Sequence, residues 1–228
     1  MKKRTLIIGN YDTAADGLWT LAACKLTKAN QVQTFVAVPG RAAPLDMSTY
    51  LTDGQPYYDN AYLEAVLESS EGDRLARKMR IDQMANYLDG QTVNIYLPDD
   101  PDRYLVGRVQ VYPEYNDLAH CAVRVSVVCD PWLYAAAETV VHLVATETEQ
   151  TAQLFNYGRL AVVPTLVTTG DVRIDYGGRS WALSAGEYVL PELYLTPGKG
   201  LGLPGIHNIT YSGAGSITIT YREAVLAV

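Results

Sequence analysis

Between residues 161 and 222 the sequence consists of short, strand-like segments separated by turn residues, and this pattern limits the possible folds most. In the last segment, Ile217, Ile219 and Tyr221 alternate with polar residues, as expected for a strand with one buried face. Many short strands at this spacing favour a β-sandwich. The predicted strands are 161–167, 172–176, 180–183, 187–190, 193–195, 208–211 and 216–222, with glycine- or proline-containing turns at 170–171, 177–178, 197–198 and 213–215.

The first part of the chain also contains strand patterns, together with a loop-rich stretch at 40–60. Residues 93–97 alternate, residues 98–102 form a proline- and aspartate-rich turn, and residues 104–111 return, which predicts a hairpin. Another strand is expected at 122–128, ending at Asp130-Pro131. Residues 61–69 have a pattern that fits a strand but is ambiguous with a helix.

One helix is predicted over Arg74–Leu88, because these residues are mostly good helix formers and Asp73 can cap the first turn. Its apolar face consists of Ile81, Met84, Ala85 and Leu88. Its basic side, formed by Arg74, Arg77, Lys78 and Arg80, is interpreted as a solvated face, with a contact patch for an acidic neighbour as the alternative.

Residues 136–150 are polar and threonine-rich in their latter half and are interpreted as a link between two domains, 1–135 and 136–228. A chain of 228 residues with 48% hydrophobic residues can bury one large core or two small ones. The prediction is a mainly β protein with one helix.

Charge and length exclude several functional classes. The net charge is −7, so binding to nucleic acid phosphates has no electrostatic support. No segment is long enough to span a membrane, and the apolar run after the basic start is too short for a signal peptide. We therefore expect folding in a cytoplasm. The three cysteines, Cys24, Cys121 and Cys129, show no paired spacing and are interpreted as buried structural thiols.

No motif indicates catalysis, a cofactor or a metal. The three histidines, His120, His142 and His207, do not match a metal-binding pattern, and no Gly-x-Ser-x-Gly elbow occurs. Residues 200–205 match Gly-x-Gly-x-x-Gly, but a strand is expected after them where a phosphate site needs a helix. Asp99, Asp100 and Asp102 are interpreted as a hairpin turn, with Ca²⁺ binding as the alternative.

The order of several short motifs resembles the distal tail proteins of siphovirus-type bacteriophages, which have long flexible tails. The first part contributes Val38-Pro39-Gly40-Arg41, with Ala43 or Pro44 where the family usually has glycine, then Tyr104-Leu105-Val106-Gly107-Arg108 and Asp130-Pro131-Trp132. The second part contributes Asn156-Tyr157-Gly158, Gly205-Ile206-His207-Asn208-Ile209 and the segment 217–222. The resemblance covers nearly the whole chain.

This resemblance implies an N-terminal, β-barrel-like belt domain and a C-terminal, galectin-like β-sandwich. It also implies a homohexameric ring at the tail tip that links the tail tube protein to the tail-tip protein and possible receptor-binding proteins. Such a virion protein would be made in the cytoplasm of a bacterial host. A ring requires arms shared between neighbours, and residues 40–60 and the hairpin 93–111 are the candidates.

Two other functions are kept as alternatives. The first is a glycan-binding β-sandwich module, with Trp181 and Tyr188 as candidate stacking residues, although Trp181 in an alternating strand fits a core position better. The second is another tail tube or baseplate subunit. Because no candidate catalytic motif has the required context, we expect a protein that is not an enzyme.

Overall fold

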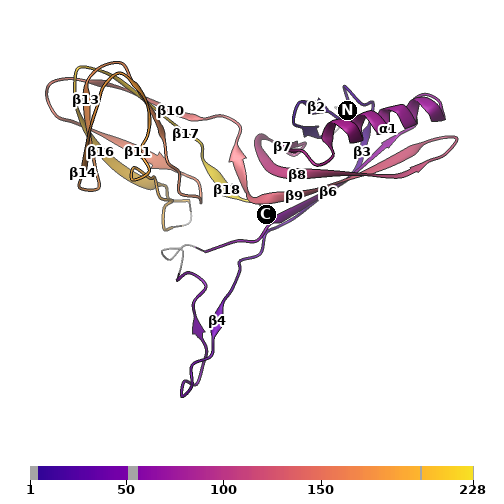
Figure 1. The fold of residues 1–228 in the computed structure, drawn as a ribbon, viewed down its shortest axis with the longest axis horizontal. Helices are drawn as coiled ribbons and strands as arrows, with labels where there is room; N and C mark the ends of the chain where they lie inside the picture. The colour runs from indigo at the N-terminus through magenta and orange to yellow at the C-terminus, as the bar shows by residue number, and fades with distance from the viewer. Residues whose placement is uncertain (1–4, 51–55, 201, 228) are drawn as a thin grey trace. The chain divides into compact units, whose positions relative to one another are not determined.

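The computed structural model describes residues 5–50, 56–200 and 202–227 of the chain (Figure 1). These residues form two compact units. Unit 1 runs to Leu133 and takes up the chain again at Leu226, and unit 2 comprises Tyr134–Val225. The predicted division between residues 135 and 136 lies close to the first crossing point, whereas the return of the C-terminus to unit 1 was not anticipated.

Unit 1 is built on an eight-stranded sheet. The strand order is β2-β1-β7-β8-β9-β6-β3, and β18 pairs with β9 beside this path. The strands are β1 (Ile7–Ile8), β2 (Tyr11–Asp12), β3 (Thr20–Thr27), β6 (Ala61–Ser69), β7 (Thr92–Leu97), β8 (Asp100–Asn116), β9 (Cys121–Ala135) and β18 (Ala224–Leu226).

Burial along β6 resolves the ambiguity between strand and helix. Alternate residues, including Ala61, Leu63, Ala65 and Leu67, are fully buried, which is the period of a strand with one face on a core. The strand pairs antiparallel with β9 in continuous register, from Ala61 opposite Cys129 to Ser69 opposite Cys121. The sequence of β6 therefore fits a central strand with partners on both sides.

The only helix among the described residues is α1, Arg74–Leu88, with the predicted bounds (Figure 1). The Asp73 carboxylate accepts a hydrogen bond from the Ala76 N–H at 2.7 Å, as an N-cap residue does. The helix packs along β8 with Ile81, Met84 and Leu88 buried. Beyond its end, the Asp89 carboxylate accepts a hydrogen bond from the Val111 N–H at 2.9 Å and ties the helix to β8.

The prediction that the basic residues of α1 form one solvated face is wrong for Arg77. Arg77 is only 1% exposed and lies on the buried side of the helix, whereas Arg74 and Lys78 are exposed. Sequence pattern grouped these side chains by charge, but residue 77 lies four positions before Ile81 and therefore on the same helical face.

Unit 2 is a sandwich of two four-stranded antiparallel sheets, ordered β10-β17-β12-β15 and β11-β16-β13-β14. Its core contains the buried residues Leu154, Leu166, Ile174, Ile209 and Ile219. The strands are β10 (Thr139–Ala145), β11 (Gln150–Asn156), β12 (Thr165–Thr168), β13 (Val172–Tyr176), β14 (Arg179–Leu183), β15 (Gly186–Val189), β16 (Gly205–Gly213) and β17 (Gly215–Tyr221). The predicted mainly β fold with one helix and a sandwich is confirmed.

The interpretation of residues 136–150 as a link is wrong. Its central residues form β10, which pairs with β17 along its whole length, from Thr139 opposite Tyr221 to Ala145 opposite Gly215. The polar residues that misled the prediction lie mainly in the turn at 146–149, whereas β10 itself is largely apolar and is an edge strand of its sheet. An edge strand keeps exposed residues on one face and one free hydrogen-bonding side.

Candidate assembly surfaces

A two-stranded arm leaves the main sheet of unit 1 between β3 and β6. Its strands β4 (Phe35–Val36) and β5 (Leu45–Asp46) pair only with each other. Nearer the sheet, the legs of the arm are joined by the pairing of Gln31 with Tyr58. The arm therefore corresponds to the predicted loop-rich segment 40–60, but it begins earlier, and residues 51–55 of that segment lie outside the described residues.

A tight turn forms the tip of the arm. The Arg41 N–H donates to the Val38 carbonyl at 3.1 Å, and Gly40 has a φ of +85°. Proline at the second position and a positive φ at the third are the features of a type II turn, which requires glycine or asparagine there. Among the described residues Ala43 and Pro44 have no positive φ, so the missing family glycine leaves no strained backbone.

The arm contributes no residue to either core. Every residue from 30 to 46 is exposed, including Val36 and Leu45, and the Phe35 side chain is 57% exposed. Unpaired strand edges and grouped apolar side chains are costly in water and typically mark sites of association. The arm is therefore the strongest candidate for a contact with another protein chain.

The two faces of the arm differ in chemistry. Phe35 lies opposite Asp46, and Val36 lies opposite Leu45. Residues directly opposite each other in an antiparallel pair project from the same face. One face thus presents an aromatic ring beside a carboxylate, and the other presents two aliphatic side chains.

The prediction that the hairpin 93–111 forms a second arm is wrong. Its strands β7 and β8 pair with each other and are flanked by β1 and β9, so they lie inside the main sheet. Ile95, Leu105 and Val109 are buried in the core. A long alternating hairpin in sequence looks the same whether its outer edges are free or paired.

The free edge of the main sheet is a further candidate surface. The last strand, β3, pairs with β6 alone, and most of its residues are exposed. Cys24 lies in this strand and is exposed, so the prediction of a buried thiol is wrong for this residue. Cys121 and Cys129 are buried as predicted, and all three thiols are free. Burial raises the pKa of the Cys129 thiol to about 12. Such a protonated, buried thiol is structural, as predicted.

A groove lies between α1 and the end of β8, with a volume of about 600 Å³. Its lining combines apolar and charged residues: Arg74, Leu75, Lys78, Ile81, Asp82, Pro113, Glu114, Tyr115 and Asn116. Leu75 is 66% exposed, although helix residues with apolar side chains more often face a core. Sequence reasoning missed this groove, because its two walls come from segments about 40 residues apart.

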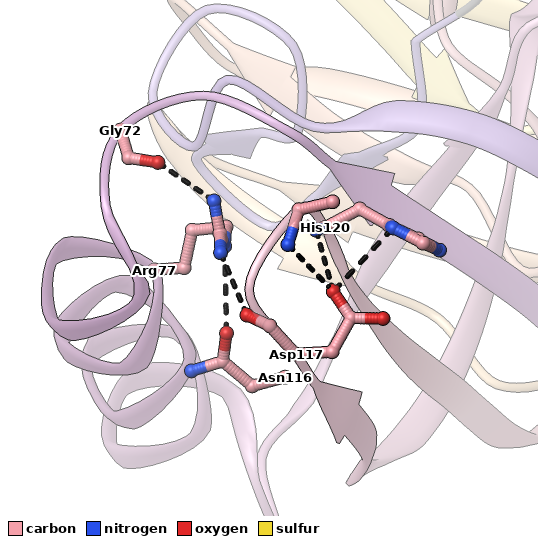
Figure 2. Close-up of polar contacts among 6 residues, drawn as sticks. Gly72, Arg77, Asn116, Asp117 and His120 are labelled. Carbon is pink, nitrogen blue, oxygen red and sulfur yellow. Dashed lines mark hydrogen bonds and ion pairs between the residues drawn. The ribbon is translucent and has the colours of Figure 1, made fainter.

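Buried Arg77 fixes the walls of this groove (Figure 2). Its guanidinium donates to the Gly72 carbonyl at 2.6 Å, the Asp117 carbonyl at 2.8 Å and the Asn116 side-chain oxygen at 3.4 Å. The Asn116 amide in turn donates to the Arg74 carbonyl at 2.9 Å. These bonds tie the start of α1 to the β8–β9 turn and satisfy most of the donors of a buried cation.

The β8–β9 turn also has an internal support. The Asp117 carboxylate accepts hydrogen bonds from the His120 N–H at 2.8 Å and the Ala119 N–H at 2.9 Å (Figure 2). These backbone N–H groups lower the pKa of the Asp117 carboxyl, so the carboxylate stays charged at neutral pH. His120 Nδ1 lies 3.5 Å from the same carboxylate.

The residues considered for metal or cofactor chemistry do not come together. Among the described residues no group of three His, Cys, Asp or Glu side chains could hold a metal ion. Asp100 forms an ion pair with Arg103 at 3.5 Å. The Gly-x-Gly-x-x-Gly segment, whose Leu201 lies outside the described residues, leads into strand β16.

The other two histidines belong to unit 2 and serve its structure. His142 hydrogen-bonds to the Thr218 hydroxyl at 3.1 Å on the neighbouring strand. His207 is buried, with the Tyr176 hydroxyl 2.8 Å from Nδ1 and the Thr196 carbonyl 2.9 Å from Nε2. Such satisfied histidines give no sign of a ligand.

The aromatic residues considered for glycan stacking are part of the packing of unit 2. Trp181 and Tyr188 are half-buried and pack against the sandwich core. The Tyr188 hydroxyl also donates to the Ser184 carbonyl at 3.1 Å. Another pair, half-buried Phe155 and exposed Tyr157, stacks at 6.2 Å between ring centroids, and the sequence pattern did not single it out.

Comparison with known proteins gave a likeness at the level of the fold. The sequence matches no known protein family and no curated protein. The fold is similar to the crystal structure of the SPP1 Dit (gp 19.1) protein, described as a paradigm of the hub adsorption apparatus in phages that infect Gram-positive bacteria. The TM-score is 0.66 and the identity 13%, over 96% of this chain and 98% of that one. The likeness shows that the two chains share a two-unit fold.

Proposed function

We propose that this chain is a structural virion protein, a hub at the distal end of a phage tail that works by binding its neighbours rather than by catalysis. The observation that carries the proposal is the fold likeness to the SPP1 Dit protein along almost the full length of both chains. The ordered motifs that resemble distal tail proteins give further support. This support is independent, because the identity to the SPP1 Dit sequence is only 13% and the fold likeness therefore does not depend on sequence similarity.

The exposed arm supports self-assembly as the mode of action. A ring of identical copies needs two different surfaces on each chain, one that reaches out and one that receives. The arm with β4 and β5 provides the first, and the free edge of β3 and the α1–β8 groove are candidates for the second. We propose a ring of six copies that joins the tail tube protein to the tail-tip protein.

Unit 2 has its own closed core and is proposed as a platform for tail-tip or receptor-binding proteins. Its exposed apolar side chains, which include Val144, Tyr157 and Val189, provide contact area for such partners. The acidic chain, with a net charge of −7, fits a passage through which DNA moves without sticking. None of the described helices is long and apolar enough to cross a membrane.

The test is the mass and symmetry of the assembled protein. Purified chain is measured by light scattering over a range of concentrations, alone and with candidate tail tube and tail-tip proteins, and then imaged by electron microscopy. Six-fold rings that bind an end of the tube support the proposal. A strict monomer that binds neither partner contradicts it.

A further inference from the structure

We infer that the α1–β8 groove of one copy receives the Phe35 and Asp46 face of the arm of a second copy. The Phe35 ring inserts into the groove, and the Asp46 carboxylate pairs with Arg74 at its rim. This inference rests on the proposed ring and names the contact that closes it.

The groove can accept an aromatic side chain. Its volume of about 600 Å³ exceeds that of one phenyl ring, and its apolar wall is formed by Leu75, Ile81, Pro113 and Tyr115. On the arm, Phe35 is the largest apolar side chain of the face that carries Asp46, and it is exposed. An aromatic anchor in a pocket is the usual centre of a protein interface.

Charge selects this face of the arm over the other. The other charged groups of the groove are already paired, Lys78 with Asp82 at 2.5 Å and Glu114 with Arg124 at 3.3 Å. No described residue forms a hydrogen bond or ion pair with the Arg74 guanidinium. The arm offers a carboxylate in Asp46, beside the aromatic ring, whereas the Val36 and Leu45 face at the same register offers none.

Both partners are held in place before they meet. The Arg77 and Asn116 hydrogen bonds fix the walls of the groove. On the arm, the Ser48 N–H donates to the Asp46 carboxylate at 2.9 Å. Hydrogen bonds from Ser48 lower the pKa of the Asp46 carboxyl, so Asp46 stays charged. Little conformational freedom is therefore lost on binding, which favours association.

A charge-reversal cycle tests the proposed pair. Arg74→Glu and Asp46→Arg, each alone, should weaken self-association by about tenfold or more, because each places like charges together. The double variant restores the opposite charges in swapped order and should recover most of the loss. Arg159→Glu, an exposed change in unit 2, is the matched control and should leave association unchanged.

A cross-link tests the same contact by position. In a Cys24→Ser background, a Phe35→Cys copy is mixed with a Leu75→Cys copy under mild oxidation, and the disulfide-linked dimer is measured. The mixture should cross-link strongly, while a Phe35→Cys copy mixed with a Tyr157→Cys copy should not.

The outcomes separate this inference from the proposed hub. If rings form but the double variant shows no recovery and the mixture does not cross-link, the groove is not the receiving surface and the hub remains. If the unmodified chain forms no ring, with or without the tail tube protein, the hub and this inference both fail.

Discussion

The arm and unit 2 are both built of antiparallel strands with apolar residues, but they differ in whether those residues are buried. In unit 2, the apolar residues of two sheets close over one another, and Leu154, Leu166 and Ile219 are fully buried. In the arm, two strands pair only with each other, and Phe35, Val36 and Leu45 stay exposed. An isolated two-stranded ribbon is at best marginally stable in water. The comparison indicates that unit 2 buries its own apolar residues, whereas the arm leaves its apolar side chains exposed.

The largest effect is expected from the core of unit 2. Leu154→Ala removes a fully buried side chain between the sheets and should lower the free energy of unfolding of this unit by about 2–5 kcal/mol. Urea denaturation followed by Trp181 fluorescence measures it, since Trp181 reports on unit 2. The exposed change Val144→Ala is the control. A cost for Leu154→Ala as small as that of the control would show that this core is not closely packed.

The Arg77 cluster should show the next largest effect, on unit 1. Arg77→Ala removes a buried guanidinium together with its hydrogen bonds to the Gly72 and Asp117 carbonyls and should cost about 3 kcal/mol. Denaturation followed by Trp19 and Trp132 measures it. Arg74→Ala, an exposed neighbour on the same helix, should change the stability of the free chain by less than about 0.5 kcal/mol. Equal costs for both variants would contradict the assignment of Arg77 as the anchor of the groove.

Alkaline pH should destabilise unit 1 through Cys129. Burial raises the pKa of this thiol from 9.0 to about 12 in the folded protein. Between these values the folded chain holds a proton that the unfolded chain has lost, so the free energy of unfolding falls as pH rises above 9. The loss due to this group is about 2 kcal/mol at pH 10.5. It is measured as the difference in pH dependence between the unmodified chain and Cys129→Ala, and parallel curves would refute it.

The smallest effect on folding is expected from the arm. The double substitution Phe35→Ser and Val36→Ser removes exposed side chains and should change the stability of the free chain by less than about 0.5 kcal/mol. The same change should reduce self-association strongly, because the arm would lose its apolar contacts. Light scattering and urea denaturation of one preparation separate the two effects. A large loss of stability would mean that the arm packs on its own chain.

The sequence predicted those features that depend on local patterns. The helix Arg74–Leu88 and its Asp73 cap follow from propensity and capping, and β13 follows from alternation. Features that depend on pairing partners were missed. The strand β10 was interpreted as a link because of the polar turn that follows it, and because its partner strand β17 comes more than 70 residues later in the chain. Arg77 was placed in solvent because two of its acceptors, at Asn116 and Asp117, come from a turn about 40 residues away.

The candidate surfaces were predictable to a similar degree. The arm was expected from its turn residues, and the Val38 to Arg41 turn confirms that reading of the local sequence. The groove could not be expected, since its walls at Leu75 and Tyr115 meet only in the folded sheet. The hairpin 93–111 was overestimated as an arm because alternation reveals which faces are buried, not which edges are paired.

The return of the chain to unit 1 has an evolutionary consequence. Unit 2 leaves after Leu133 and rejoins at Leu226, and β18 then pairs with β9, with the Ala227 N–H donating to the Pro131 carbonyl at 2.9 Å. The two ends that flank unit 2 are thus held next to each other by the sheet of unit 1. Recombination can replace unit 2 as a whole while the sheet of unit 1 keeps its strands. Proteins with this architecture can therefore change unit 2 in evolution while the sheet of unit 1 stays the same.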